Sequence, residues 1–219
     1  MEETSFQPPF SPTSTMSLAD AVGVSQAQKT SAISHDKKWF ISFVMHNTER
    51  SCFRRLLSDF ADAPFAYDFE PYVASQRELH VWSNGRRKMV DRILFPSYLF
   101  IHCTEKVRKS IMENAPYIRG FMKDPSRERN FFGASPFAFI PDQQMENLRR
   151  MAADAETPVT IDPSQLHVGR RVLVRGGKLN GFEGNVLREP NGRTYVTISL
   201  DFLGYAKVEV PFEQLEVIE

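Results

Sequence analysis

The sequence predicts an α+β fold, in which an antiparallel sheet with packed helices is followed by a small five-stranded β-barrel. Three observations support this prediction. Strand and helix patterns alternate over residues 37–151, a polar segment containing proline follows at residues 152–164, and five short strand patterns separated by turn signals fill residues 165–219. We therefore expect two domains, 37–151 and 165–219, joined by a linker at 152–164.

Residues 1–36 are rich in Pro, Ser, Thr, Ala and Gln and show little hydrophobic periodicity, so we expect a disordered tail. Charge also divides the chain. The tail has one basic and four acidic residues, residues 37–150 have 19 and 13, and residues 151–219 have seven and ten. The middle segment is therefore suited to approach nucleic acid, although its excess of basic over acidic residues is small for a free-standing DNA-binding protein.

The first domain opens with a strand pattern from Trp39 to Met45, which is apolar on both faces and so predicts a central strand. Asn47 or Thr48 is placed to cap a following helix, in which Glu49 is expected to face water. The apolar residues of that helix fall at helical spacing. They are Cys52, Phe53, Leu56, Leu57 and Phe60.

A β-hairpin is predicted next. Glu78–Trp82 alternates as a strand, Asn84-Gly85 provides a tight turn, and Arg86–Val90 forms the return strand. A long apolar run, Ile93–Ile101, follows as a further strand. Pro96 within it cannot donate a ladder hydrogen bond, so we expect a bulge or a sheet edge there.

Two more helices and a strand complete the first domain. Thr104 is expected to cap a helix over residues 105–114, and a strand is expected near Ile118–Met122. A last helix opens at Asp142, with one apolar face that ends at Met151.

The C-terminal segment predicts strands only. Gly, Asn and Pro punctuate it at short intervals, which is typical of a small closed barrel. The apolar residues that mark the five strands are Val172 and Val174, Val186, Val196 and Ile198, Val208 and Val210, and Leu215 and Val217.

The residues that commonly carry catalysis or bind metals are dispersed. Cys52 and Cys103 lie in no CxxC motif or Cys/His cluster. Gly176-Gly177-Lys178 is not part of a phosphate-binding loop motif. No two of the histidines show metal-ligand spacing or pair with a nucleophile. They are His35, His46, His80, His102 and His167. We therefore expect no enzymatic activity, no metal and no cofactor.

Neither a membrane segment nor a secretory signal is predicted. The chain has no run of about 18 apolar residues, and it begins Met1-Glu2-Glu3 without a basic or apolar leader. We expect a cytoplasmic protein without membrane partners.

Three stretches in order resemble the NusG family of transcription factors, over nearly the whole chain from residue 37. The first is Lys37–Phe40, the family's opening strand, and the second joins the basic Gly85–Lys88 to Arg92–Phe100, similar to the family's hairpin and Phe-Pro-Gly-Tyr strand. The third, Val168–Val186, resembles a KOW motif, which implies an SH3-like barrel. Its hallmark glycine is Gly184, where a side chain would clash in a tight bend.

Some residues depart from the common family pattern. Ser97 stands where the family usually has glycine, and Leu203-Gly204-Tyr205 differs from the usual loop. These features, with Gly181–Leu187, resemble the specialised UpxY-like paralogues of surface-polysaccharide operons in Bacteroides-like bacteria. Those relatives are processive antiterminators. The resemblance implies a factor that binds RNA polymerase and promotes transcription of long operons.

The resemblance also implies binding residues in the first domain. Phe95 and Tyr98 match an apolar patch that docks on the clamp helices of RNA polymerase, although both rings could instead belong to the core. A basic cluster on and after the hairpin tip could contact DNA or nascent RNA in the elongation complex, or be an ordinary solvated turn. The cluster comprises Arg86, Arg87, Lys88 and Arg92, and Arg54 and Arg55 could extend it.

In the KOW segment, five residues match a family surface that binds a small-subunit ribosomal protein or the Rho terminator. They are Leu179, Phe182, Phe202, Leu203 and Tyr205. Their alternative is a place in the barrel core. A competing hypothesis for the whole chain is a KOW-type RNA- or ribosome-binding protein without polymerase docking, but residues 151–219 are acidic overall.

Overall fold

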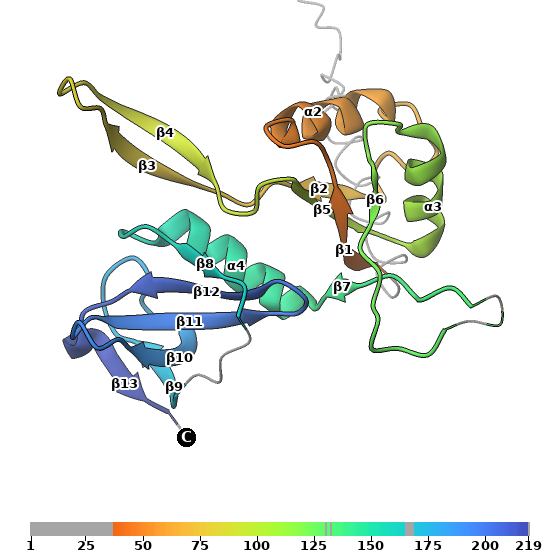
Figure 1. Ribbon diagram of the computed structural model, residues 1–219. Coiled ribbons are helices and arrows are strands. Elements are labelled where there is room, and N and C mark those ends of the chain that lie inside the picture. Colours follow the sequence, from red (N-terminus) through yellow and green to blue (C-terminus); the bar gives the residue numbers. More distant parts are fainter. Residues whose placement is uncertain (1–36, 130, 132, 165–168, 219) are drawn as a thin grey trace, which may run out of the picture. The chain divides into compact units, whose positions relative to one another are not determined.

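The computed structural model describes residues 37–129, 131, 133–164 and 169–218 (Figure 1). The expected tail lies outside these residues, as do His35 and His167. The described part folds into three α-helices and three antiparallel sheets, which confirms the α+β class. None of the described helices is long and apolar enough to cross a membrane.

The central sheet is built around the first predicted strand, β1 (Lys38–Phe43). Its partner β5 (Tyr98–Cys103) pairs with it along its full length, and β2 (Glu70–Tyr72) pairs with the other side of β5. The short strands β6 (Gly120–Phe121) and β7 (Phe139–Ile140) both pair with the free edge of β1. Four of the six β1 residues are buried, so the prediction of a central strand is confirmed.

Helices cover both faces of this sheet, and that is why β1 and β5 are apolar on both sides. On one face, α2 (Glu49–Asp59) and α3 (Glu105–Asn114) pack in a cluster with Phe40, Leu99 and Ile101. Helix α4 (Asp142–Asp154) belongs to the cluster of the opposite face. That second cluster contains Trp39, Ile41, Phe100, Met145, Leu148 and Met151.

The predicted hairpin is confirmed and forms a sheet of its own. Strands β3 (Ser75–Val81) and β4 (Arg87–Ile93) pair residue by residue from Ser75↔Ile93 to Val81↔Arg87. At the turn, Arg86 N donates to Asn84 Oδ1 over 3.1 Å. In Figure 1 the hairpin projects from the central sheet.

The apolar run Ile93–Ile101 is not one strand, which corrects the prediction. Strand β4 ends at Ile93, residues 94–97 form a turn, and β5 begins at Tyr98. Ser97 holds a left-handed backbone conformation with φ of 69°. Proline at position 96 therefore lies in a turn between two strands of different sheets, where its missing donor is tolerated.

Glu49 is buried rather than solvent-facing, with 1 % of its surface exposed. Its Oε1 accepts the backbone N–H of Ser97 over 2.6 Å and that of Asn47 over 3.3 Å. Thr48 occupies the N-cap position, but its hydroxyl donates to Met45 O instead of capping the helix. The carboxylate at the start of α2 thus ties the helix to the turn before β5, and the helix dipole favours its charge.

The C-terminal sheet contains the five predicted strands and a sixth. The predicted ones are β9 (Arg171–Val174), β10 (Glu183–Arg188), β11 (Thr194–Leu200), β12 (Gly204–Glu209) and β13 (Leu215–Val217), which follows the 3₁₀ turn η1 (Phe212–Gln214). The sixth, β8 (Thr160–Asp162), pairs with β12 and gives the order β13-β9-β10-β11-β12-β8.

Strand β8 lies within residues 152–164, where the sequence predicts a linker. Residues 152–154 still belong to α4, and residues 160–162, of which Ile161 packs against the core, add backbone hydrogen bonds to the edge of β12. A strand of three residues is too short to show a hydrophobic period in the sequence. At Gly204, a Cβ would lie 2.1 Å from Asp162 O, so glycine permits this pairing.

Candidate functional site

Phe95, the first residue expected to dock on a partner, is only 5 % exposed. Its ring packs edge-on against Phe100, with 5.6 Å between centroids, inside the cluster that includes α4. The alternative of a core position therefore describes Phe95 in this structure, and its docking on RNA polymerase stays a prediction.

Tyr98, the second expected docking residue, is half-buried at the start of β5. It lies opposite Phe43 in the β1–β5 register, and the two rings are 5.6 Å apart. Beyond Phe43, the side chain of Met45 is 54 % exposed. Tyr98 is therefore the member of the predicted pair that solvent can reach.

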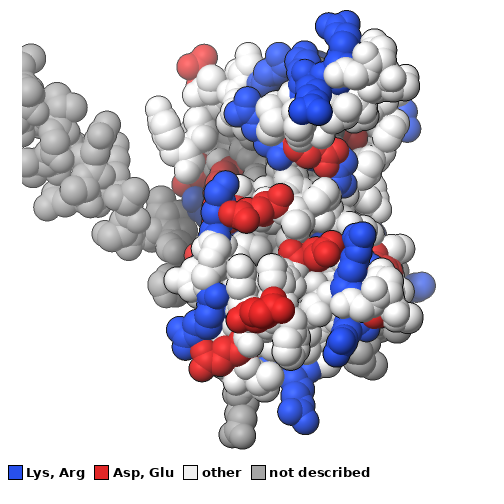
Figure 2. Space-filling view, turned by 90° about the vertical axis from the view of Figure 1, so that its left-hand side faces the viewer, with Lys and Arg blue, Asp and Glu red and all other residues white. Residues whose placement is uncertain are grey.

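The basic hairpin tip is solvated as expected. Arg86, Arg87 and Lys88 are exposed, and none of them forms an ion pair with any carboxylate in the described part of the chain. Lys and Arg side chains gather at the top of the face in Figure 2, where the tip points toward the viewer. These three cations are free to meet an external anion.

Arg92 differs from the other three residues of its predicted cluster. Its guanidinium pairs with Glu78 over 2.8 Å and donates to Val159 O over 2.6 Å. The neighbouring side chain of Gln76 accepts from Val159 N over 2.7 Å and donates to Thr157 O over 2.9 Å. Arg92 thus anchors the base of the hairpin to the segment before β8, and its contact with nucleic acid stays a prediction.

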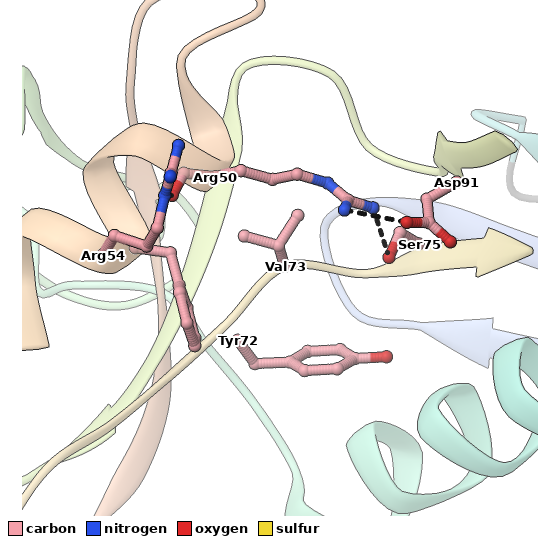
Figure 3. A pocket seen from close by; sticks show the side chains of 7 residues that line it. Arg50, Arg54, Tyr72, Val73, Ser75 and Asp91 are labelled. Carbon is pink, nitrogen blue, oxygen red and sulfur yellow. Dashed lines mark hydrogen bonds and ion pairs between the residues drawn. The ribbon is translucent and has the colours of Figure 1, made fainter.

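A pocket of about 670 Å³ opens between α2 and the base of the hairpin (Figure 3). Arg50 reaches across it to Asp91 over 3.0 Å and to Ser75 Oγ over 3.3 Å, while Arg54 stands exposed at its rim. The remaining wall comprises Phe53, Tyr72 and Val73. The sequence indicated Arg54 but not Arg50, whose place depends on the distant strands β3 and β4.

Arg55 does not join this rim. Its guanidinium lies over the ring of Tyr117 at 4.1 Å, and the hydroxyl of Tyr117 donates to Asp59 over 2.9 Å. Burial first, and then the hydrogen bond to Asp59, raises the pKa of Tyr117 well above its usual range. This group of side chains fastens α2 to the loop after α3.

Four of the five residues expected to form the C-terminal partner surface are buried. Leu179, Phe182, Leu203 and Tyr205 are at most 8 % exposed, so the alternative of a core position describes them here. Phe202 is 36 % exposed, with a left-handed φ of 69°. Any role of these residues in partner binding stays a prediction.

The loops that carry these residues touch α4. Arg150 donates to Asn180 O over 2.5 Å and lies over the ring of Phe182. Gln144 exchanges hydrogen bonds with Asp201, accepting from its backbone N–H and donating to its carboxylate. Helix α4 thus contacts the C-terminal sheet as well as the central one, a role that its single apolar face did not predict.

Two titratable side chains of the described part, His102 and Cys103, have pKa values shifted by burial. His102 stacks on Trp39 at 4.7 Å, and its burial lowers its pKa although Asp142, 3.5 Å away, favours the charged form. Burial raises the pKa of the Cys103 thiol to about 12. Within the described residues, no group of three His, Cys, Asp or Glu side chains is placed to hold a metal ion.

Comparison with known proteins identifies the family. The family model "Transcription termination factor nusG" matches residues 37–149, which is just over half of the chain. The "Transcription termination/antitermination protein NusG" of Halalkalibacterium halodurans is 26% identical over 155 residues, which cover 68% of this chain and 80% of that protein.

Solved structures of similar proteins superpose loosely on this chain. "Domain interaction in Thermotoga maritima NusG" gives a TM-score of 0.44 at 18% identity and covers 84% of this chain and 98% of that one. "Crystal Structure of MjSpt4:Spt5 complex conformation A" gives 0.27 at 14% identity, with 83% and 98% covered. The residues that the family model matches include the central sheet, the helices on both of its faces and most of α4. The chain therefore belongs to the NusG family of transcription termination and antitermination factors.

Proposed function

We propose that this protein is a non-enzymatic transcription elongation factor that binds RNA polymerase and favours antitermination on long operons. The observation that carries the proposal is the family match over residues 37–149, which includes the central sheet and the basic hairpin. The curated relative is itself named a termination/antitermination protein. The resemblance to processive UpxY-like paralogues supports the antitermination side of that name.

The proposed mechanism needs only unequal binding to two states of the polymerase. A factor that binds the elongating form more tightly than the paused form shifts the population toward elongation. The shift cannot exceed the difference in binding free energy between the two states. No acid, base or nucleophile is required for such an effect.

The proposed polymerase contact centres on Tyr98. Its half-buried ring beside Phe43 offers an aromatic surface, and aromatic residues are frequent hot spots in interfaces. Phe95 supports this surface from within, because it packs on Phe100, two residues further along β5. Direct contact by Phe95 would require the cluster around it to open.

The proposed nucleic-acid contact uses the hairpin tip. Arg86, Arg87 and Lys88 are exposed and lie close together along the chain, so they suit the phosphates of a strand that passes the polymerase. Such contacts set orientation and weaken as salt rises. Partners of the KOW segment, whether a ribosomal protein or Rho, stay part of the proposal.

The test is a reconstituted transcription assay with RNA polymerase on a template that carries a terminator. Wild-type protein should raise readthrough, and Tyr98→Ala should lose polymerase binding by about tenfold or more while remaining folded. Tyr67→Ala is the matched control, because Tyr67 is almost fully exposed and lies outside the predicted docking surface. Increased termination would contradict antitermination, and binding to ribosomes without polymerase would favour the KOW-type alternative.

A further inference from the structure

We propose that one face of the β3–β4 hairpin binds an unpaired nucleic-acid strand, with a base stacked on the indole of Trp82. This inference rests on the proposed nucleic-acid contact of the hairpin and names the form of nucleic acid that the contact takes. The face is defined by His80, Trp82, Arg86 and Lys88, and we refer to it as the stacking face.

The pairing of the two strands brings these four side chains together. His80 lies opposite Lys88 in the register, and Trp82 N donates to Arg86 O over 2.9 Å. Alternate residues of a strand point to the same side of a sheet. The stacking face therefore places the rings of His80 in β3 and of Trp82, directly after β3, beside two cations, Lys88 in β4 and Arg86 directly before β4.

The opposite face of the hairpin has a different character. It carries Leu79, Val81 and Met89, which are 54 %, 52 % and 45 % exposed, together with Arg87. Aliphatic side chains do not provide the flat surface on which a base stacks. The opposite face therefore provides a control for any effect of the stacking face.

Trp82 is positioned for a ligand rather than for the core. Its side chain is 41 % exposed, and it belongs to neither of the two hydrophobic clusters. The ring of His80 packs against it with centroids 4.5 Å apart at 75°, which restricts the orientation of the indole. A restricted aromatic ring loses little further freedom when it binds.

The chemistry of this face favours single strands over duplexes. In a duplex the faces of the bases are stacked on one another, whereas an unpaired strand offers them to an aromatic side chain. Arg86 and Lys88 supply the charge that holds the flanking phosphates. A duplex would meet only the two cations, so its affinity should not depend on Trp82.

The experiment measures binding of the full chain to a short labelled oligonucleotide by fluorescence anisotropy at low salt. The same sequence is offered as single-stranded DNA, as single-stranded RNA and as duplex DNA. Wild-type protein should prefer the single strands, and Trp82→Ala should weaken that binding about tenfold with little change for the duplex. Trp82→Phe should retain part of the affinity, because it keeps an aromatic ring.

Met89→Ala, on the opposite face, is the matched control and should bind like the wild type. Equal affinity for duplex and single strand, or an unchanged affinity in Trp82→Ala, overturns the proposal. So does an effect of Met89→Ala as large as that of Trp82→Ala, which would point to a protein partner or to hairpin stability. If the wild-type protein promotes readthrough with RNA polymerase but binds none of the oligonucleotides, the stacking proposal fails and the proposed function stands.

Discussion

At the scale of single residues, Ser97 and Glu49 show how a substitution in a family pattern is accommodated. Ser97 takes a left-handed conformation at a position where the resemblance leads one to expect glycine. Its N–H is held by the buried carboxylate of Glu49 over 2.6 Å. The sequence resemblance indicated the unusual residue, but the helical pattern placed Glu49 in solvent, since its partner lies 48 residues away.

Ser97→Gly should stabilise the protein by up to about 1 kcal/mol. Glycine removes a left-handed strain of about 1–2 kcal/mol, and the greater freedom of the unfolded chain offsets about 0.5–1 kcal/mol of this gain. Urea unfolding of both proteins measures the difference. Ser58→Gly, at an exposed position of α2, should instead destabilise; a loss of stability in Ser97→Gly as well would refute the strain at this turn.

His102 should make stability depend on pH. Because burial lowers its folded pKa below the ordinary value of 6.5, the unfolded chain binds the proton more readily. The stabilisation that the neutral form of His102 gives to the folded state is therefore complete above about pH 6.5. It is lost as the pH falls from there through the lowered folded pKa. Asp142 and Glu70 oppose the shift, whereas Lys37 and Arg149 reinforce it.

The measurement is the urea midpoint at about pH 7.5 and at about pH 5.5. His102→Gln should reduce the difference between the two midpoints. If this variant kept the wild-type pH dependence, His102 would not be its source.

At the scale of elements, the helices and strands with a clear hydrophobic period or turn signal could be predicted from the sequence. Strand β1 with both faces buried, the hairpin turn at Asn84-Gly85 and the inner face of α4 are all as expected. The break at residues 94–97 was missed because an uninterrupted apolar run does not reveal where a chain leaves one sheet for another. Strand β8 was missed because its three residues, Thr160–Asp162, are too few to show a hydrophobic period.

Gly184→Ala should strongly destabilise the C-terminal sheet. An added Cβ would lie 2.5 Å from Val196 Cγ1 and 2.8 Å from Thr197 O, so strand β11 would have to move. Overpacking of this kind costs about 1–3 kcal/mol or more. Thermal unfolding should show the loss, whereas Gly120→Ala, whose nearest new contact is 3.9 Å away, should be close to neutral. Similar melting of the two variants would exclude a steric role for Gly184.

At the scale of the whole molecule, the two predicted domains stay a hypothesis that the described contacts refine. Each sheet has its own strand order, but α4 contributes to a cluster that also contains the C-terminal sheet. The exposure of the candidate residues could be predicted at Arg86, Arg87 and Lys88, which lie at a hairpin tip. It could not be predicted at Phe95 or Phe182, because their burial depends on elements far away in the sequence.

A C-terminal fragment that begins before β8 should be more stable than one that begins at residue 165. The longer fragment, 156–219, retains the pairing of Thr160–Asp162 with β12 and the hydrogen bond of Tyr205 to Asp162. Circular dichroism on heating compares the two. Identical melting would mean that β8 adds nothing to the sheet, and a failure of both to fold would argue against a separate C-terminal domain.

The anchoring of the hairpin by Gln76 has a consequence for folding kinetics. Gln76 and Val159 are 83 residues apart, so their hydrogen bond closes a long loop, and contacts of this kind form late because chain entropy opposes them. Gln76→Ala should therefore accelerate unfolding in a stopped-flow experiment while leaving refolding nearly unchanged. The hairpin would then be the part of the molecule that attaches last to the folded chain and detaches first.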